Sequence, residues 1–169
     1  MSIYVRSMQV EDIDILAEEF GIKQGWHDKT TELFTMYFDE HISSKRYVSV
    51  ALVGDSIAGY ATLLPNDEIG AFANRSIPVV CDFNVLKKFQ RQGVGSALMD
   101  EIEKTAKQMS NEICLAVGLY KDYGTAQRMY VKRGYVPDGS GVWHNGRNLQ
   151  PYEACVNDDD LVLWMSKTL

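Results

Sequence analysis

Hydrophobic positions recur along the chain with two periods, one typical of strands and one typical of helices. In the first half, β-prone runs at residues 3–6, 47–53 and 57–64 alternate with helix-like segments at residues 10–20 and 30–41. Asp28 is available as the N-terminal cap of the second helix. The sequence Gly54-Asp55-Ser56 separates two of the runs and is typical of a hairpin turn. This half of the chain therefore predicts antiparallel strand pairing.

The second half alternates strands with helices. We expect strands at residues 79–86, 113–117 and 161–165, and helices at residues 94–109 and 125–132, the latter ended by Gly134. Such alternation favours βαβ connections and parallel pairing. The pattern predicts an α/β fold with an α+β mixed sheet and helices on both faces. Residues 137–160 form a long segment that is expected to include an ordered loop, and we expect a single domain, 1–169.

The net charge of the chain limits the classes of partner that we expect it to bind. The formal net charge is -6 and the pI is about 5.0, which argues against nucleic acid as a partner, because phosphate backbones need many Lys and Arg contacts. No stretch approaches the roughly 18 apolar residues of a membrane span, and the N-terminus lacks a signal-peptide core. We expect a cytoplasmic protein whose partner is cationic or neutral and that binds no membrane.

The three cysteines predict no metal site. Cys81, Cys114 and Cys155 are widely spaced and lie in or beside apolar runs. No CxxC or HxxxH spacing accompanies them. We therefore expect buried free thiols in a reducing compartment.

The segment Gln90-Arg91-Gln92-Gly93-Val94-Gly95 joins a predicted strand to a predicted helix. The first N–H groups of a helix attract anions, and two glycines let a phosphate approach the backbone. Lys87, Lys88 and Arg91 add positive charge here. A dinucleotide site would need a third glycine where Leu98 stands. Spacing alone leaves two readings open, a diphosphate site and a solvated turn.

Two motifs in this order resemble the GNAT superfamily of acetyl-CoA-dependent N-acetyltransferases. Asp82-Phe83-Asn84-Val85 followed by Gln90-x-x-Gly93-x-Gly95 resembles its motif A. The run from Ala126 through Tyr130 to Gly134-Tyr135 resembles its motif B. Val5-Arg6 with Asp12 and the segment 163–167 resemble the opening and closing elements of the family, so the likeness covers nearly the whole chain.

The resemblance implies a GNAT-like fold, with a central mostly antiparallel sheet and a parallel, splayed strand pair. It also implies that acetyl-CoA is the co-substrate, with no metal. The family frequently has Asn where this chain has Tyr123, so one contact near the thiol arm stays open. The cofactor-binding residues carried over by the resemblance are Phe83, Asn84, Val85, Gln90, Arg91, Gln92, Gly93, Val94, Gly95, Ser96, Tyr123, Ala126 and Tyr130.

The resemblance also implies a mechanism, in which a neutral primary amine attacks the thioester directly within a ternary complex. Tyr130 stands where the family commonly places the general acid for the thiolate. Asp82 is the first candidate for the general base, although a carboxylate near pKa 3.9 needs burial or an ordered water for that role. The structural alternatives are a core aromatic for Tyr130 and a carboxylate satisfied by its neighbours for Asp82.

The acceptor is the least defined part of the prediction. A small cationic amine and an exposed protein amine both fit, and residues 20–30, 65–78 and 137–160 are expected to shape its site. The acidic run Asp158-Asp159-Asp160 fits a solvated turn better than an amine pocket. Two other functions stay open, a non-catalytic acyl-CoA-binding module and an acyltransferase for another acyl group or acceptor. A homodimer is compatible with the sequence, which offers no argument for one.

Overall fold

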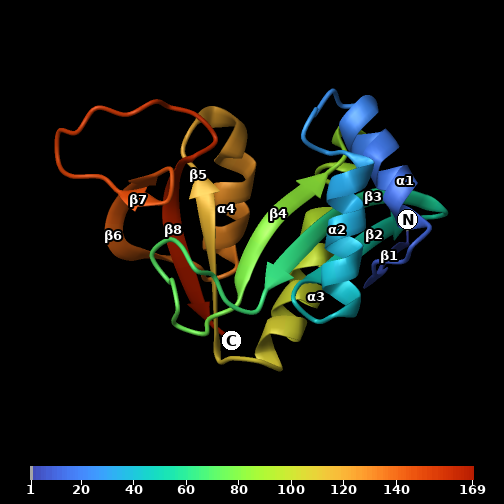
Figure 1. Ribbon diagram of the computed structural model, residues 1–169, viewed down its shortest axis with the longest axis horizontal. Helices are drawn as coiled ribbons and strands as arrows, with labels where there is room; N and C mark the ends of the chain where they lie inside the picture. The colour runs from blue at the N-terminus through green and yellow to red at the C-terminus, as the bar shows by residue number, and fades with distance from the viewer. Residues whose placement is uncertain (1) are drawn as a thin grey trace. The chain divides into compact units, whose positions relative to one another are not determined.

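The computed structural model describes residues 2–169 (Figure 1). Within these residues it contains four α-helices and eight strands that form a mixed sheet, so the predicted fold class is confirmed. The elements in chain order are β1 (Ile3–Ser7), α1 (Asp12–Leu16), the π-helix η1 (Ala17–Ile22), α2 (Thr31–Ile42), β2 (Tyr47–Val53), β3 (Ser56–Leu64), β4 (Val79–Val85), the 3-10 helix η2 (Lys87–Phe89), α3 (Val94–Lys107), β5 (Glu112–Gly118), the 3-10 helix η3 (Lys121–Tyr123), α4 (Gly124–Lys132), β6 (Val136–His144), β7 (Arg147–Asn148) and β8 (Leu161–Thr168).

The chain divides into two compact units. Unit 1 comprises Met1–Leu64 and Asp82–Lys104, and unit 2 comprises Pro65–Cys81 and Thr105–Leu169. Strand β4 and helix α3 each begin in one unit and end in the other. A single domain over the whole chain stays a prediction.

The strands of unit 1 pair as the sequence predicts. β1 is antiparallel to β2, with Ile3 opposite Val53, and β2 forms an antiparallel hairpin with β3. Gly54 takes a positive φ of 59° in the hairpin turn, a conformation that glycine adopts without steric cost. β4 follows β3 in the strand order. The predicted hairpin is confirmed.

Helices cover both faces of the sheet in unit 1. Adjacent residues of β3 point to opposite faces. The ring of Tyr60 packs edge-on against Phe20 and Phe34, which belong to η1 and α2. On the other face, a Cβ atom at Gly59 would lie 3.2 Å from the Leu98 side chain on α3. The core residues beneath α1, η1 and α2 include Leu16, Val48, Val50, Ile57 and Leu86.

Unit 2 contains the parallel strand pair. β4 runs parallel to β5 through the pairs Val79–Cys114 and Val80–Leu115. β8 is antiparallel to β5, β6 is antiparallel to β8, and β7 is antiparallel to β6. The sheet is therefore mostly antiparallel and includes the parallel pair β4–β5, as the resemblance implies. A second core cluster contains Phe72, Ile77, Val79, Cys114 and Trp164.

Residues 137–160 include a loop, as expected, at residues 149–160, but the segment also holds most of β6 and all of β7, two strands that the sequence did not predict. β6 escapes the sequence pattern since most of its side chains are exposed, so it lacks alternating hydrophobic positions. Its pairing with β8 is also shifted between Pro137 and Val142, where Gly139 and Gly141 both have φ of 86°.

Several helix boundaries also differ from the prediction. Thr30, and not Asp28, caps α2, since the Thr30 side chain accepts a hydrogen bond from the Leu33 amide at 3.2 Å. The helix expected at residues 10–20 is α1 followed by the π-helix η1. α3 ends at Lys107, so Met109 lies beyond the helix and is exposed. No helix within residues 2–169 is long and apolar enough to cross a bilayer.

The three cysteines differ in burial. Cys114 is buried, Cys81 is half-buried and Cys155 is exposed. The expectation of buried thiols is therefore wrong for Cys155, which follows β7 on an exposed segment instead of entering a strand. All three are free thiols, as predicted.

Candidate functional site

The predicted anion-binding turn lies at the N-terminus of α3, in unit 1. Arg91 and Gly93 have positive φ values of 61° and 91°, and turns that contain such residues can direct successive backbone N–H groups toward an anion. The amide of Ala97 donates to the carbonyl of Gly93 at 3.0 Å, which places the first turn of the helix at Val94–Ser96. The positive end of the helix dipole adds to the attraction for an anion.

Two glutamine side chains brace this turn from within. Gln90 Nε2 donates to the Val85 carbonyl at 3.0 Å, and Gln92 Nε2 donates to the Lys88 carbonyl at 2.8 Å. The loop from the end of β4 to the start of α3 is thus tied to itself at two points. The geometry favours backbone amides, rather than the glutamine side chains, as the groups that would hold a diphosphate.

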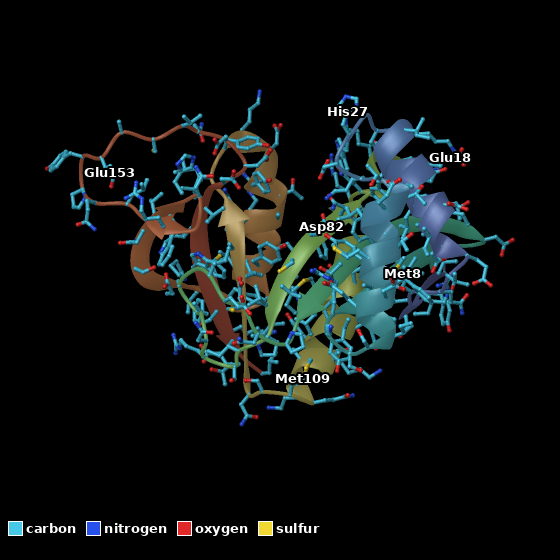
Figure 2. The ribbon with its side chains drawn as sticks, in the orientation of Figure 1. Met8, Glu18, His27, Asp82, Met109 and Glu153 are labelled. Carbon is cyan, nitrogen blue, oxygen red and sulfur yellow. The ribbon has the colours of Figure 1, made fainter. Side chains whose placement is uncertain are left out.

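Asp82 lies on β4 in unit 1 (Figure 2). Its carboxylate is the centre of a hydrogen-bonded cluster. Its Oδ1 accepts hydrogen bonds from Lys29 Nζ and Asn84 Nδ2, both at 2.8 Å. Its Oδ2 accepts hydrogen bonds from the hydroxyls of Tyr37 and Tyr60, both at 2.9 Å. The backbone φ of Asp82 is 41°, which is uncommon for a residue with a side chain. We call these five residues the Asp82 cluster.

The Asp82 cluster is largely shielded from water. The side chains of Lys29 and Asp82 are 13% and 14% exposed, and Tyr60 is fully buried. Burial lowers the pKa of the Lys29 ammonium, but the carboxylates of Asp82 and Asp28 outweigh this effect and raise its pKa above the usual value. Burial and the Asp82 carboxylate both raise the pKa of the Tyr60 phenol. At neutral pH the cluster therefore holds a charged lysine and a protonated Tyr60.

Tyr123, the residue that departs from the family pattern, is fixed by two contacts in unit 2. Its ring lies against Gly118 at the end of β5, where a Cβ atom would come within 2.3 Å of the ring. Its hydroxyl donates to Asp159 Oδ1 at 2.7 Å. Burial and this hydrogen bond raise the pKa of the Tyr123 phenol. The Tyr123 ring therefore occupies space that only a glycine at position 118 leaves open.

The acidic run before β8 is not merely a solvated turn. Asp159 Oδ1 also accepts from the Tyr120 hydroxyl at 2.6 Å, and these two phenols lower the pKa of Asp159. Asp158 lies 3.0 Å from Nε2 of His144, which is half-buried. A hollow of about 560 Å³ lies beside Tyr120, Lys121, Asn157, Asp158 and Asp159.

Tyr130 lies on α4 and is 6% exposed. Its ring packs against Tyr135 with centroids 5.7 Å apart, and Gly134 ends the helix with a φ of 91°, as predicted. Burial raises the pKa of the Tyr130 phenol, so the group is protonated at neutral pH. Ala126 lies one turn earlier on the same helix and is half-buried. The structure is thus compatible with both roles that the sequence left open for Tyr130, a core aromatic residue and a proton donor.

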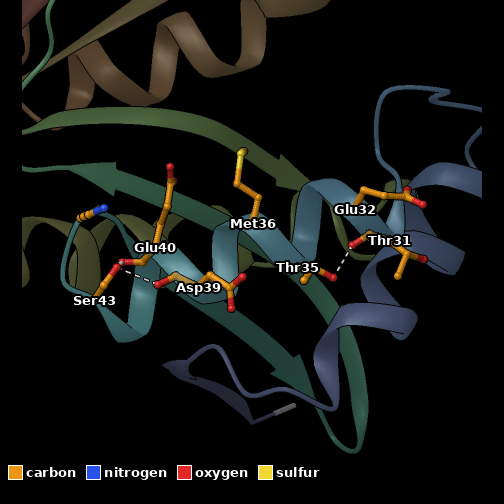
Figure 3. Close-up of a pocket in the computed structure, with 8 residues that line it drawn as sticks. Thr31, Glu32, Thr35, Met36, Asp39, Glu40 and Ser43 are labelled. Atoms are coloured by element: carbon orange, nitrogen blue, oxygen red, sulfur yellow. Dashed lines mark hydrogen bonds between the residues drawn. The ribbon is translucent and has the colours of Figure 1, made fainter.

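A hollow of about 660 Å³ runs along the exposed face of α2 in unit 1 (Figure 3). It is lined by Thr31, Glu32, Thr35, Met36, Asp39, Glu40, Ser43 and Lys45. None of the residues predicted to bind the cofactor belongs to this lining. The hollow is open and acidic, and its two dashed hydrogen bonds in Figure 3 are the i to i+4 bonds of Thr35 and Ser43 to helix carbonyls.

Sequence reasoning missed three members of the Asp82 cluster. Lys29 lies 53 residues before Asp82, Tyr37 lies 45 residues before it and Tyr60 lies 22 residues before it. No local pattern marks a contact between residues so far apart in sequence. In unit 1 the structure brings together Asp82 with Asn84, and Val85 with Gln90, and in unit 2 it places Tyr123, Ala126 and Tyr130 on or beside α4.

Comparison with known proteins identifies relatives over nearly the whole chain. A family model described as the acetyltransferase (GNAT) family matches residues 10–135. Ard1 from Thermoplasma volcanium is 21% identical with a TM-score of 0.70, over 100% of this chain and 99% of that one. The ribosomal-protein-alanine N-acetyltransferase from Brucella melitensis is 15% identical with a TM-score of 0.73, over 98% and 99%. The PaiA N-acetyltransferase from Thermoplasma acidophilum, in complex with coenzyme A, is 15% identical with a TM-score of 0.68, over all of both chains. No curated protein matches this chain.

Proposed function

Because the family model spans residues 10–135, the chain belongs to the acetyltransferase (GNAT) family, and we propose that it transfers an acetyl group from acetyl-CoA to a primary amine. The observation that carries the proposal is the braced turn at the N-terminus of α3, in which Arg91 and Gly93 have left-handed backbone conformations. A diphosphate is the anion that such a turn accommodates, and the coenzyme A bound to the similar PaiA structure contains one.

The chemistry has two requirements that the chain's residues must meet. The amine must lose a proton before it attacks, and at pH 7 a lysine-like amine is about 4.6 kcal/mol from its neutral form. The bond from nitrogen to the acetyl carbon then forms, the bond from that carbon to sulfur breaks, and the thiolate must be stabilised. We propose Tyr130 as the proton donor to the thiolate, supported by its burial and its protonated phenol.

The predicted role of Asp82 as the base is harder to reconcile with its surroundings. Each of its carboxylate oxygens already accepts two hydrogen bonds. To accept a proton from the substrate, Asp82 would have to release one of these donors. The base role therefore stays a proposal, and the measurement that tests it is whether Asp82→Asn lowers kcat at saturating acetyl-CoA by a far larger factor than it weakens coenzyme A binding.

The experiment that tests the proposed function measures coenzyme A binding by calorimetry and thiol release with acetyl-CoA and a panel of primary amines. The wild-type protein should bind coenzyme A and release thiol only when an amine is present. Gly93→Ala should weaken binding, because an alanine resists a φ of 91° and narrows the approach of the diphosphate. Gly54→Ala is the matched control, since Gly54 also has a positive φ, 59°, but lies in the β2–β3 turn with nothing near its Cβ position.

Each other outcome points to a different function. Coenzyme A binding without thiol release against any amine would favour a non-catalytic binding module. Faster thiol release from a longer acyl thioester than from acetyl-CoA would favour a different acyl donor. Absence of coenzyme A binding by folded protein would overturn the proposal.

A further inference from the structure

Lys29 is linked to the predicted donor-binding strand through the carboxylate of Asp82. We propose that Lys29 is a positioning residue for the acyl donor. Its ammonium group fixes the Asp82 carboxylate, and the carboxylate in turn stabilises the positive φ of the Asp82 backbone in β4. That backbone conformation orients the residues that follow in the strand. The inference rests on the proposed function, because it takes Phe83, Asn84 and Val85 to bind the pantetheine arm.

The backbone of β4 at Asp82 needs external support. A φ of 41° is uncommon for a residue with a side chain, and such a conformation persists only where surrounding contacts hold it. The contacts on the Asp82 carboxylate come from the segment before α2 through Lys29, from α2 through Tyr37, and from β3 through Tyr60. Three elements therefore converge on the one residue of β4 with a positive φ.

The network reaches a predicted donor-binding residue directly. Asn84 Nδ2 donates to Asp82 Oδ1 at 2.8 Å and to the Tyr60 hydroxyl at 3.0 Å. A change in the position or charge of the Asp82 carboxylate therefore alters the side chain of Asn84, two residues further along β4. This connection distinguishes the Lys29–Asp82 pair from an ion pair that only stabilises the fold.

Lys29 is the only charged donor among the four that contact Asp82. A carboxylate that is 14% exposed loses most of its hydration, and neutral donors replace that hydration less well than an ammonium group. Without Lys29, the Asp82 side chain is expected to turn toward solvent, which breaks hydrogen bonds to Tyr37, Tyr60 or Asn84.

The fold delivers Lys29 to this place through its backbone. A Cβ atom at Gly21 would lie 2.2 Å from the Lys29 carbonyl oxygen, so η1 and the segment before α2 touch backbone to backbone. The Lys29 amide also donates to the Trp26 carbonyl at 2.9 Å. Since these contacts fix the main chain of Lys29, its side chain loses less conformational freedom when it binds Asp82.

The test is the affinity for coenzyme A itself, which binds without turnover and without any base. We expect Lys29→Met to weaken binding on the order of tenfold, within the roughly 5- to 150-fold that coupling between linked sites typically gives in affinity. Lys29→Arg keeps the charge and should stay within about threefold of the wild type. Tyr37→Phe, which removes one neutral donor and keeps the ring, should give a smaller loss in the same direction. Lys23→Met is the matched control, since Lys23 forms ion pairs with Glu18 and Glu19 on the surface.

Chemical rescue separates the ammonium group from the rest of the lysine side chain. Lys29→Ala lacks a propylammonium fragment, so added n-propylammonium should restore much of its coenzyme A affinity. The same salt should do nothing for a Lys29→Ala, Asp82→Asn double variant, which has no carboxylate to bind it. Thermal unfolding of every variant shows whether each is folded under the conditions of the titration.

The outcomes separate this inference from the proposed function. If wild-type protein does not bind coenzyme A, the proposed function fails. If the wild type binds it and folded Lys29→Met and Tyr37→Phe bind it equally well, the positioning role is overturned while the proposed function stands. If Lys29→Met is unfolded, unchanged affinity in Tyr37→Phe together with no rescue of Lys29→Ala overturns the positioning role just as clearly.

Discussion

Gly59 on β3 offers a way to move β4 without altering any polar group. A Cβ atom at this position would lie 2.7 Å from the backbone carbonyl oxygen of Asn84, and 3.2 Å from side-chain atoms of Val85 and Leu98. Asn84 and Val85 belong to the segment predicted to bind the pantetheine arm. The new Cβ atom of Gly59→Ala is fixed to the backbone and cannot rotate away. We therefore expect Gly59→Ala to displace the donor-binding strand.

The size of the displacement follows from the contact distance. The gap of 2.7 Å is about 0.7 Å short of the 3.4 Å at which ordinary contact begins. Overpacking of this kind costs about 1–3 kcal/mol. For a chain of 169 residues, 2 kcal/mol corresponds to a fall in Tm of about 4–8 °C. A shift of 0.7 Å in the strand should weaken coenzyme A binding on the order of tenfold, which lies within the usual range of coupling between a remote change and a binding site.

The assay combines thermal unfolding with calorimetric titration of coenzyme A. The control is Val48→Ala, which removes two methyl groups from a side chain that is 1% exposed on β2 and costs about 2 kcal/mol. Gly59→Ala and Val48→Ala should lose similar stability, whereas only Gly59→Ala should lose affinity. Equal affinities for the two variants would refute the placement of the pantetheine arm on Phe83, Asn84 and Val85.

Three further predictions follow from the same contacts. Tyr130→Phe should lower kcat by about 10²-fold and leave the KM for acetyl-CoA nearly unchanged, as steady-state kinetics will show; a fall below twofold contradicts the role of the phenol. Gly118→Ala places a Cβ atom 2.3 Å from the Tyr123 ring and should lower Tm by about 4–8 °C, and an unchanged Tm contradicts the packing. The pKa of Lys29 is raised in the folded protein, so its contribution to stability is fully present below about pH 10.4 and is lost as pH rises through the folded pKa. The free energies of unfolding of the wild type and of Lys29→Met, measured with denaturant, should therefore converge only above the folded pKa of Lys29. Convergence at neutral pH contradicts the ion pair.

The sequence predicts best where local patterns decide the structure. The β2–β3 hairpin, the helix after the Gly93 turn and the end of α4 at Gly134 all depend on residues within a few positions of one another. Glycines with positive φ and hydrophobic periodicity are local signals, so they can be read without the fold. The motifs around Gly93 and Tyr130 belong to this class.

The rest depends on contacts that local patterns do not encode. β6 looks like a loop because it presents few buried side chains, and its place beside β8 comes from backbone pairing. Lys29 meets Asp82 across 53 residues, and Tyr120 meets Asp159 across 39. Such pairs form when separate elements fold together, so the surroundings of Asp82 could be known only from the structure.

Labelled acetyl-CoA provides the most direct measurement of the central claim, the transfer of an acetyl group to an amine. The protein is supplied with acetyl-CoA that carries an isotopic label in the acetyl group, together with a primary amine, and mass spectrometry follows the label while free thiol is measured. The account predicts one labelled acetyl group on the amine nitrogen for each thiol released. Release of thiol with the label in free acetate, or no release at all from folded protein that binds coenzyme A, would contradict it.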